Sequence, residues 1–169
     1  LFFSIKNYLP LEMMINLKIK LPKNVEKIIE ILRMNKKKAF VVGGCIRDCV
    51  MGNEPEDWDI ATSAKPNETA EIFREYRLVL TGIKHGTVGV IIDKNVYEIT
   101  TYRIDGEYND CRHPNSVTFT DKLSYDLSRR DFTVNAMAFN PKDGLTDLFG
   151  GQADLKSGAI RCVGDPDKR

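Results

Sequence analysis

Apolar residues near the start of the chain recur at helical spacing. The positions are Val25, Ile28, Ile29 and Leu32. They fall on one face of a helix, and three lysines at 36–38 follow where the helix dipole favours positive charge. The pattern therefore predicts an amphipathic helix over residues 23–35. We interpret the lysines as a solvated helix end in preference to an RNA contact.

The next part of the chain alternates between short apolar runs and amphipathic stretches. Residues 39–42 are continuously apolar, which predicts a buried strand, and residues 45–51 follow as a helix. Residues 57–62 predict a second strand, and residues 67–76 predict another helix. Strands and helices are thus expected to share one sheet-based fold.

The middle of the chain predicts a hairpin. Two β-rich runs, 87–92 and 95–101, are joined by Asp93-Lys94, which indicates a tight turn. Residues 104–123 are polar and lack periodicity, so we expect a long loop there. A helical segment then leads through residues 129–131 into an apolar stretch.

The last third adds short elements. The chain is expected to close with the segment 145–151, a short helix near 153–156, and a strand at 159–163. Helices mixed with hairpins are typical of an α/β domain. The expected fold is a mixed, mostly antiparallel sheet flanked by helices.

Composition changes this picture little. The chain has 169 residues with 42% hydrophobic and 29% charged positions, which is ordinary for a soluble globular domain. The net charge of +1 argues against RNA binding through bulk charge, although a local site stays open. No apolar run approaches the length needed to cross a membrane, and no protein partner is indicated.

The chain has four cysteines, which are too sparse for a disulfide scaffold. They are Cys45, Cys49, Cys111 and Cys162. Cys111 and His113 could begin a zinc site, but no tight ligand quartet is present, so we do not favour one. Reduced thiols and a cytoplasmic location are expected.

Asp57 and Asp59 are the sharpest chemical feature. On a strand, residues two apart face the same side and lie roughly 6.6 Å apart along it. Two such carboxylates can hold one or two hard cations, which in two-metal sites lie ~3.5–4 Å apart. Oxygen ligands favour Mg²⁺ or Mn²⁺ over zinc. An acidic pair alone is more often a surface feature without a ligand.

A diglycine upstream strengthens the case for a nucleotide site. Gly43-Gly44 separates the first strand from the following helix. Glycine lets a phosphate approach the backbone closely, and a helix N-terminus favours its charge. Arg47 lies one turn further and could contact the same phosphates. A strand-to-helix turn without a ligand could have the same sequence. The case for a nucleotide site therefore depends on the combination of the diglycine with Asp57 and Asp59.

These residues resemble a known family. The segments 43–48 (GGCIRD) and 57–62 (DWDIAT) are similar to the head of the CCA-adding enzyme and poly(A) polymerase family, within the DNA polymerase β-like nucleotidyltransferase superfamily. The segment 129–136 (RRDFTVNA) resembles the family's second motif, and 147–151 (DLFGG) resembles its third, a hinge between head and neck. The resemblance covers about residues 24–169.

The resemblance implies roles for individual residues. Asp57 and Asp59 would hold two catalytic Mg²⁺ ions, and the glycines Gly43 and Gly44 would bind nucleotide phosphates together with Arg47. Arg130 and Asp131 would position the nucleotide. From chemistry alone, Asp131 could accept a hydrogen bond from a ribose 2′-OH, or could cap a helix or pair with its arginine neighbours.

Two further residues are left open. Glu98 could lie beside the aspartate pair as a third ligand or as a base for the RNA 3′ hydroxyl, or could only pair with Arg103. His85 is interpreted as structural. Its surroundings, Thr81 to Val88, resemble CCA-adding members more than poly(A) polymerases, but do not decide between them.

The expected activity is CCA addition: CTP and ATP are joined to the 3′ end of tRNA, and pyrophosphate is released. The alternatives are a poly(A) polymerase or an A-adding enzyme of the family, a metal-dependent phosphohydrolase, and a nucleotide-binding module without catalysis. Keeping both aspartates argues against the last. Residues 1–20 are expected to be an extension, 21–163 the head domain, and 164–169 the start of a neck domain. Base selectivity in the family lies in that neck.

Overall fold

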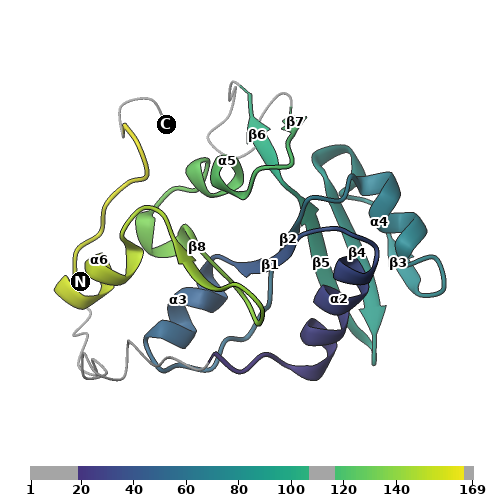
Figure 1. The fold of residues 1–169 in the computed structure, drawn as a ribbon, viewed down its shortest axis with the longest axis horizontal. Coiled ribbons are helices and arrows are strands. Elements are labelled where there is room, and N and C mark those ends of the chain that lie inside the picture. The colour runs from purple at the N-terminus through teal and green to yellow at the C-terminus, as the bar shows by residue number, and fades with distance from the viewer. Residues whose placement is uncertain (1–18, 107–116, 166–169) are drawn as a thin grey trace.

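A seven-stranded sheet forms the centre of the computed structural model, which describes residues 19–106 and 117–165 (Figure 1). In spatial order its strands are β3 (Arg77–Val79), β4 (Thr87–Ile92), β5 (Asn95–Thr101), β2 (Ile60–Thr62), β1 (Ala39–Val42), β8 (Met137–Asn140) and β9 (Gly144–Asp147). A small two-stranded sheet pairs β6 (Arg103–Asp105) with β7 (Val117–Phe119).

Short helices surround this sheet. They are α2 (Lys23–Met34), α3 (Gly44–Val50), α4 (Pro66–Ile72), α5 (Leu123–Ser128) and α6 (Gly151–Ser157), with 3₁₀ turns η1 (Ile83–His85) and η2 (Thr133–Asn135). The pairing of β2 with β5 is parallel, whereas the other pairings in the large sheet are antiparallel. The expected mixed, mostly antiparallel sheet flanked by helices is confirmed.

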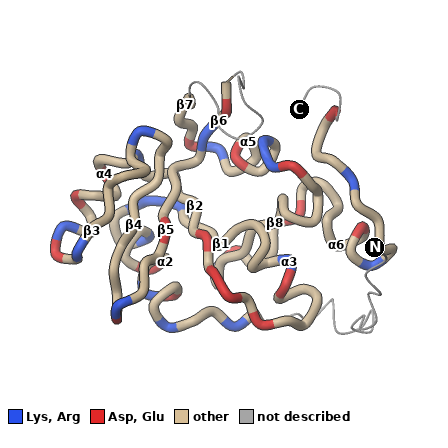
Figure 2. Tube along the Cα trace, turned by 180° about the vertical axis from the view of Figure 1, so that it is seen from behind, with Lys and Arg blue, Asp and Glu red and all other residues tan. Residues whose placement is uncertain are grey.

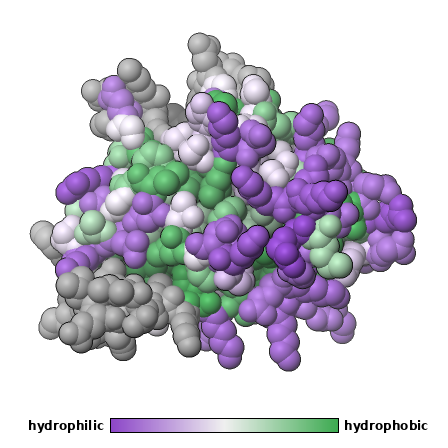
Figure 3. All heavy atoms as spheres, in the orientation of Figure 1, coloured by the Kyte–Doolittle hydropathy of each residue, from purple (hydrophilic) through white to green (hydrophobic). Residues whose placement is uncertain are grey.

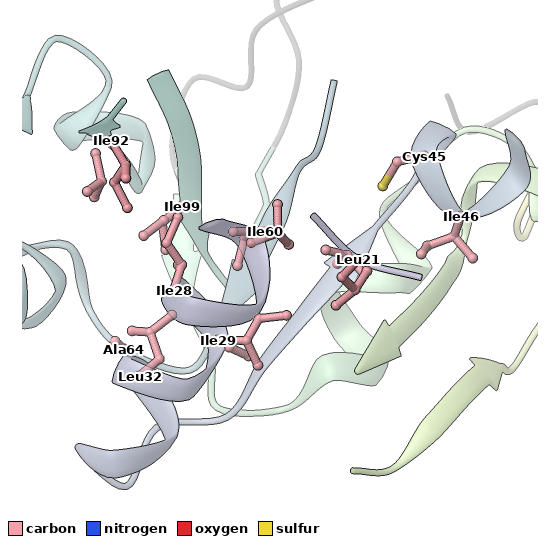
Figure 4. Packing of buried hydrophobic residues seen from close by; sticks show 14 of the residues in the cluster. Leu21, Ile28, Ile29, Leu32, Cys45, Ile46, Ile60, Ala64, Ile92 and Ile99 are labelled. Atoms are coloured by element: carbon pink, nitrogen blue, oxygen red, sulfur yellow. The ribbon is translucent and has the colours of Figure 1, made fainter. Parts of the chain in front are cut away.

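Helix α2 covers one face of the sheet with its apolar side. Its buried residues are Val25, Ile28, Ile29 and Leu32, the four positions that the periodicity indicated. Figure 4 shows Ile28 and Ile29 directed toward the strand residues Ile60 and Ile99. Burying apolar surface is the main favourable term in folding. The outer side of α2 and α4 is hydrophilic (Figure 3).

Alternation along the strands divides the core into two layers. Val41 and Ile60 belong to the core beneath α2, α3 and α4, whereas their neighbours Val42 and Ala61 pack on the opposite face with Leu127 of α5. Successive strand side chains point to opposite faces. Every second residue of β1 and β2 therefore faces α5, which decides where the chemistry lies.

The strand containing the aspartates is shorter than expected. We predicted a strand over residues 57–62, but β2 comprises only Ile60–Thr62. The backbone N–H of Val42 still donates to the carbonyl oxygen of Asp59 at 3.0 Å, so one more ladder bond precedes the strand. Asp57 and Trp58 lie in the segment that leads into it.

Other sequence predictions need correction. The helix expected to reach residue 76 ends at Ile72, and β3 follows at Arg77–Val79 where no strand was expected. Part of the expected loop 104–123 forms the β6–β7 pair. The strand expected at 159–163 is absent from the described chain, where a single bridge joins Phe132 and Cys162. Helices this short give a weak periodic signal, and a lone bridge gives none.

The hairpin prediction is confirmed. Strands β4 and β5 pair antiparallel, from Thr87 opposite Thr100 to Ile92 opposite Asn95. Asp93 and Lys94 both adopt left-handed backbone angles, with φ of 51° and 68°. Two such residues in sequence are what a type I′ turn requires.

Helix α6 is anchored to the segment that follows α5. The carboxylate of Asp147 accepts the backbone N–H groups of Gly151 at 2.8 Å and Gln152 at 2.9 Å, which caps the helix. The buried carboxylate of Asp154 accepts a hydrogen bond from Thr133 Oγ1 at 2.6 Å. A side chain at Gly151 would overlap the Thr133 carbonyl oxygen. Close backbone packing therefore explains this glycine.

Candidate active site

Strand alternation places Asp59 on the α5 side of the sheet. Ile60 faces the α2 core and Trp58 packs at the edge of the same core. Asp59, one residue out of phase with Ile60, lines a pocket with Ala61 on the other side, and Asp57 lies in the segment that precedes the strand; both aspartates are exposed. Figure 2 shows acidic positions along the segment between α3 and β2, with basic positions nearby at α5 and β6.

The Asp59 carboxyl lies in a charged environment. Protein packed around it raises its pKa, Arg130 opposes that shift, and Asp57 adds to it. Part of the residue nevertheless remains accessible to solvent. A like charge such as Asp57 disfavours the ionised form of a neighbouring carboxyl.

A pocket of about 230 Å³ opens beside Asp59. Its lining is Val42, Asp59, Ile60, Ala61, Thr87, Glu98, Thr100, Arg103, Arg129 and Arg130. Ligand pockets for whole small molecules usually measure roughly 300–1,000 Å³. This pocket therefore suits the phosphate end of a nucleotide better than the whole molecule.

Arg130 lies against Gly43 and Asp59. A Cβ atom placed on Gly43 would be 2.8 Å from Nη1 of Arg130 and 3.9 Å from Oδ2 of Asp59. Gly43 also has φ of 86° and ψ of −140°, a conformation that side chains rarely adopt. Burial lowers the pKa of Arg130, while the carboxylates of Asp126 and Asp59 act in the opposite direction. The diglycine thus makes room for a guanidinium.

The backbone of Gly43 is used differently from what we expected. Its N–H donates to the carbonyl oxygen of Met137 at 3.2 Å, so in this structure that group is committed to β8. Gly44 begins α3, and a Cβ there would lie 3.4 Å from Nη2 of Arg47. Phosphate binding by Gly43 and Gly44 stays a prediction.

Arg47 is connected to the second motif by Asn135. Nη1 of Arg47 donates to Oδ1 of Asn135 at 2.9 Å, and Nε donates to Oδ1 of Asp48 at 2.9 Å. Asn135 also donates to Oδ1 of Asp131 at 3.4 Å. Asn135 was not singled out in the sequence, because an asparagine after a short apolar run gives no chemical signal by itself.

Asp131 lies at the turn that begins η2. Its Oδ1 accepts the backbone N–H of Phe132 at 2.8 Å, and the residue is exposed. This is a local contact with the next residue and not a helix cap, because Phe132 is the N-cap of η2 and no side chain caps it. The side chain remains accessible from solvent, so the role of Asp131 in nucleotide binding stays a prediction.

Glu98 enters the site from β5. Its neighbour Ile99 pairs with Ile60 across the parallel β2–β5 contact, and Glu98 lines the same pocket as Asp59. The alternative pairing with Arg103 is not what the structure shows: Nε of Arg103 donates to Oδ1 of Asp105 at 2.8 Å. Glu98 is therefore a second carboxylate at the pocket, together with Asp59.

The structure separates the expected site residues into two connected groups. Asp59 and Arg130 share the pocket beside Gly43, whereas Arg47 and Asp131 meet through Asn135. Among the residues that the structure describes, no group of three potential metal ligands is already assembled. Cys111 and His113, the other metal candidates, lie outside the described residues.

Two features that the sequence did not assign lie at the pocket. Arg103 and Arg129 line it, and the carboxylate of Asp126 lies behind them. The spacing of Asp126 to Arg129 and Arg130, three and four residues, was a usable signal because such pairs meet on a helix. His85 was interpreted as structural. Its backbone carbonyl oxygen accepts a hydrogen bond from Nη1 of Arg103.

The fold and the pocket define a class: an α/β head domain that brings paired carboxylates and arginines to one sheet edge. The chain belongs to the family of poly(A) polymerase head domains, whose model matches residues 39–161.

Curated relatives of the chain are CCA-adding enzymes. The chain is 48% identical to the CCA-adding enzyme of Oceanobacillus iheyensis over 142 residues, 84% of this chain and 35% of that protein. It is 49% identical to that of Levilactobacillus brevis over 132 residues, 78% of this chain and 33% of the relative. The chain thus spans about a third of the length of the curated relatives it matches.

Solved structures agree with the fold. The crystal structure of the Bacillus stearothermophilus CCA-adding enzyme in complex with CTP matches with a TM-score of 0.78 and 39% identity, covering 89% of this chain and 36% of that one. The Thermotoga maritima CCA-adding enzyme complexed with tRNA matches with a TM-score of 0.63 and 29% identity, over 90% and 35%. In the described part of this chain, no helix has the length and apolarity to cross a membrane.

Proposed function

We propose that this chain is the catalytic head of a template-independent RNA nucleotidyltransferase that builds CCA on the 3′ end of tRNA from CTP and ATP. The observation that carries the proposal is the meeting of Asp59, Glu98 and Arg130 at one pocket, with Asp57 contributing to the raised pKa of Asp59. Relatives named CCA-adding enzymes, including one solved with CTP and one with tRNA, support the substrates.

Asp57 and Asp59 would hold Mg²⁺, most simply as two ions. Their oxygen donors suit a hard cation, and their repulsion, which helps to raise the pKa of Asp59, favours a positive ion between them. The bound metal would supply positive charge to the transferring phosphate and to the attacking hydroxyl. No protein nucleophile is required.

The remaining residues bind and orient. Arg130 would contact the triphosphate from the pocket, and Arg47, with its fixed guanidinium fork, would contact it from α3. Asp131 would accept a hydrogen bond from the ribose. Glu98 would either complete the metal ligands or accept the proton of the RNA 3′ hydroxyl. Catalysis would then rest on positioning and charge.

The domain assignment belongs to the same proposal. Residues 21–163 would form the head, and residues 164–169, of which 166–169 lie outside the described residues, would begin the neck. The extension expected at 1–20 lies almost entirely outside the described residues as well. Because base selection in the family lies in the neck, this chain by itself should bind triphosphates with little base preference and extend RNA weakly.

The test is extension of a tRNA that lacks its 3′ terminus, with Mg²⁺ and single nucleoside triphosphates. Two C residues followed by one A establish CCA addition. Long A tracts indicate a poly(A) polymerase, and a single A indicates an A-adding enzyme. Triphosphate binding without any extension, also when the downstream sequence of a relative is attached, would refute catalysis and support the binding module.

A further inference from the structure

A fully buried carboxylate lies directly behind the arginines of the pocket. Asp126 on α5 has no exposed surface. Its Oδ1 accepts a hydrogen bond from Nε of Arg129 at 3.0 Å and from the backbone N–H of Arg103 at 3.3 Å. Its Oδ2 lies 3.6 Å from Nη2 of Arg130. One carboxylate therefore touches all three arginines that line the pocket.

Arg130 spans the distance between two carboxylates. Its Nη2 faces Asp126, and its Nη1 lies against Gly43, near Oδ2 of Asp59. The contact of 3.6 Å with Asp126 exceeds ordinary hydrogen-bond length, which is about 2.7–3.2 Å. Asp126 therefore orients this guanidinium by charge. Because a guanidinium carries five N–H donors in a fixed fork, it can meet a phosphate while it faces Asp126.

The neighbouring groups keep Asp126 in place. Arg129 is shared between Asp126 and Asp105, with Nη1 of Arg129 3.4 Å from Oδ2 of Asp105. Nε of Arg103 contacts Oδ1 of the same Asp105 at 2.8 Å. The three arginines that line the pocket are thus held by two aspartates behind it. A guanidinium held in this way can present its remaining N–H donors to a phosphate.

Stability alone is a poor explanation for this arrangement. Removing a carboxylate from water is costly, and a buried ion pair often contributes no more than well-packed apolar residues would. The arrangement does fix the direction of a functional guanidinium. Asp59 also attracts Arg130, so without the charge of Asp126 a pairing with Asp59 would turn Arg130 from the phosphate and neutralise a metal ligand.

We propose that Asp126 is a positioning residue that holds Arg130 away from Asp59 and toward the triphosphate of the incoming nucleotide. The inference rests on the proposed function for the identity of the ligand. It assigns a role to a residue that lies outside the nucleotide's reach and acts through Arg130.

A double-mutant cycle tests this role. The affinity of the chain for CTP with Mg²⁺ is measured by calorimetry for the unmodified chain, Asp126→Asn, Arg130→Gln and the double variant. Asp126→Asn removes the charge that orients the guanidinium and Arg130→Gln removes the guanidinium itself, so each single change should weaken binding roughly tenfold or more. If Asp126 acts through Arg130, the double variant should bind no more weakly than Arg130→Gln alone.

Asp154→Asn is the matched control. Asp154 is also a buried aspartate on a short helix, but its partners are Thr133 and Arg161. Its replacement should lower the melting temperature and leave the CTP affinity within twofold. If Asp126→Asn does not fold, Asp126→Glu, which displaces the carboxylate by one methylene, replaces it in the same cycle. Non-additivity with Arg130→Gln is again the expected result.

The outcomes separate the inference from the proposed function. The inference is wrong if the Asp126 variant binds CTP like the unmodified chain while Arg130→Gln does not, or if the two losses multiply in the double variant. It is also wrong if the unmodified chain binds neither CTP nor inorganic tripolyphosphate. If the cycle is non-additive with tripolyphosphate but no RNA is extended, the positioning role stands and the proposed activity fails.

Discussion

At the scale of single residues, the site depends on which side chains share a face of the sheet. Asp59 faces the α5 side because it lies one residue out of phase with Ile60 and in phase with Ala61. That much could be expected from the sequence, since residues two apart on a strand point the same way. The position of Arg103 could not, because it reaches the site from β6, a three-residue strand most of which lies in the expected loop 104–123.

Replacement of Gly43 by alanine tests the close approach of Arg130. The backbone angles of Gly43 and the 2.8 Å contact of a Cβ with Nη1 of Arg130 both oppose a side chain. We expect a loss of about 1–3 kcal/mol in the free energy of unfolding and weaker CTP binding, measured by urea denaturation and calorimetry.

Gly144→Ala is the control for that substitution. Gly144 also has a positive φ, of 75°, but a Cβ there meets nothing within 4 Å. This variant should lose stability through backbone strain and keep its CTP affinity. Equal CTP affinity in the two variants would show that Arg130 does not depend on the space at Gly43.

Cysteine reactivity tests the packing beneath the diglycine. Burial raises the pKa of the Cys45 thiol to about 12, whereas Cys162 is exposed. Because the thiolate is the reactive form, Cys45 should stay protonated and resist iodoacetamide from pH 7 to pH 10, and Cys162 should react throughout. Mass spectrometry of the peptides measures both, with urea-unfolded protein as the control. Fast labelling of Cys45 in the folded chain would contradict the structure.

At the scale of elements, the third motif is a helix cap. Asp147 ends β9 and accepts two backbone N–H groups at the start of α6. Through Gly151 and Asp154, α6 in turn packs on Thr133, two residues after Asp131. The motif that resembles a hinge is thus connected to the segment carrying Asp131 and Asn135.

Asp147→Ala should destabilise the chain by about 0.5–2 kcal/mol, the usual loss when a capping side chain is removed. Asp147→Asn keeps an oxygen acceptor and should lose less. Urea unfolding of the two variants measures the difference. If alanine and asparagine are equivalent, the cap contributes nothing and the hydrogen bonds to Gly151 and Gln152 are not stabilising.

The elements that the sequence predicted well are those with a repeated pattern. Helix α2 has four apolar residues at helical spacing on one face, and in the β4–β5 hairpin a turn separates two long β-rich segments. Strands of three residues, such as β3 and β7, repeat too little to be recognised. They exist because a neighbouring strand or loop provides hydrogen-bond partners, which is tertiary information.

At the scale of the whole molecule, the sheet separates the larger hydrophobic core from the candidate active site. The face covered by α2, α3 and α4 holds the larger core, and the face toward α5 holds the carboxylates and arginines. Near-neutral net charge accompanies this local concentration of arginines. Family membership accounts for the arrangement, and the chain spans about a third of its curated relatives.

The most direct measurement is single-nucleotide extension of a tRNA ending before its CCA, with Mg²⁺, by the unmodified chain and by Asp57→Asn and Asp59→Asn. Melting temperature and CTP binding without metal are measured alongside as controls for folding. We predict slow incorporation of C with pyrophosphate release by the unmodified chain, and a loss of at least about a hundredfold in either variant while both stay folded. Incorporation by either folded variant at the rate of the unmodified chain would contradict the assignment of the active site to Asp57 and Asp59.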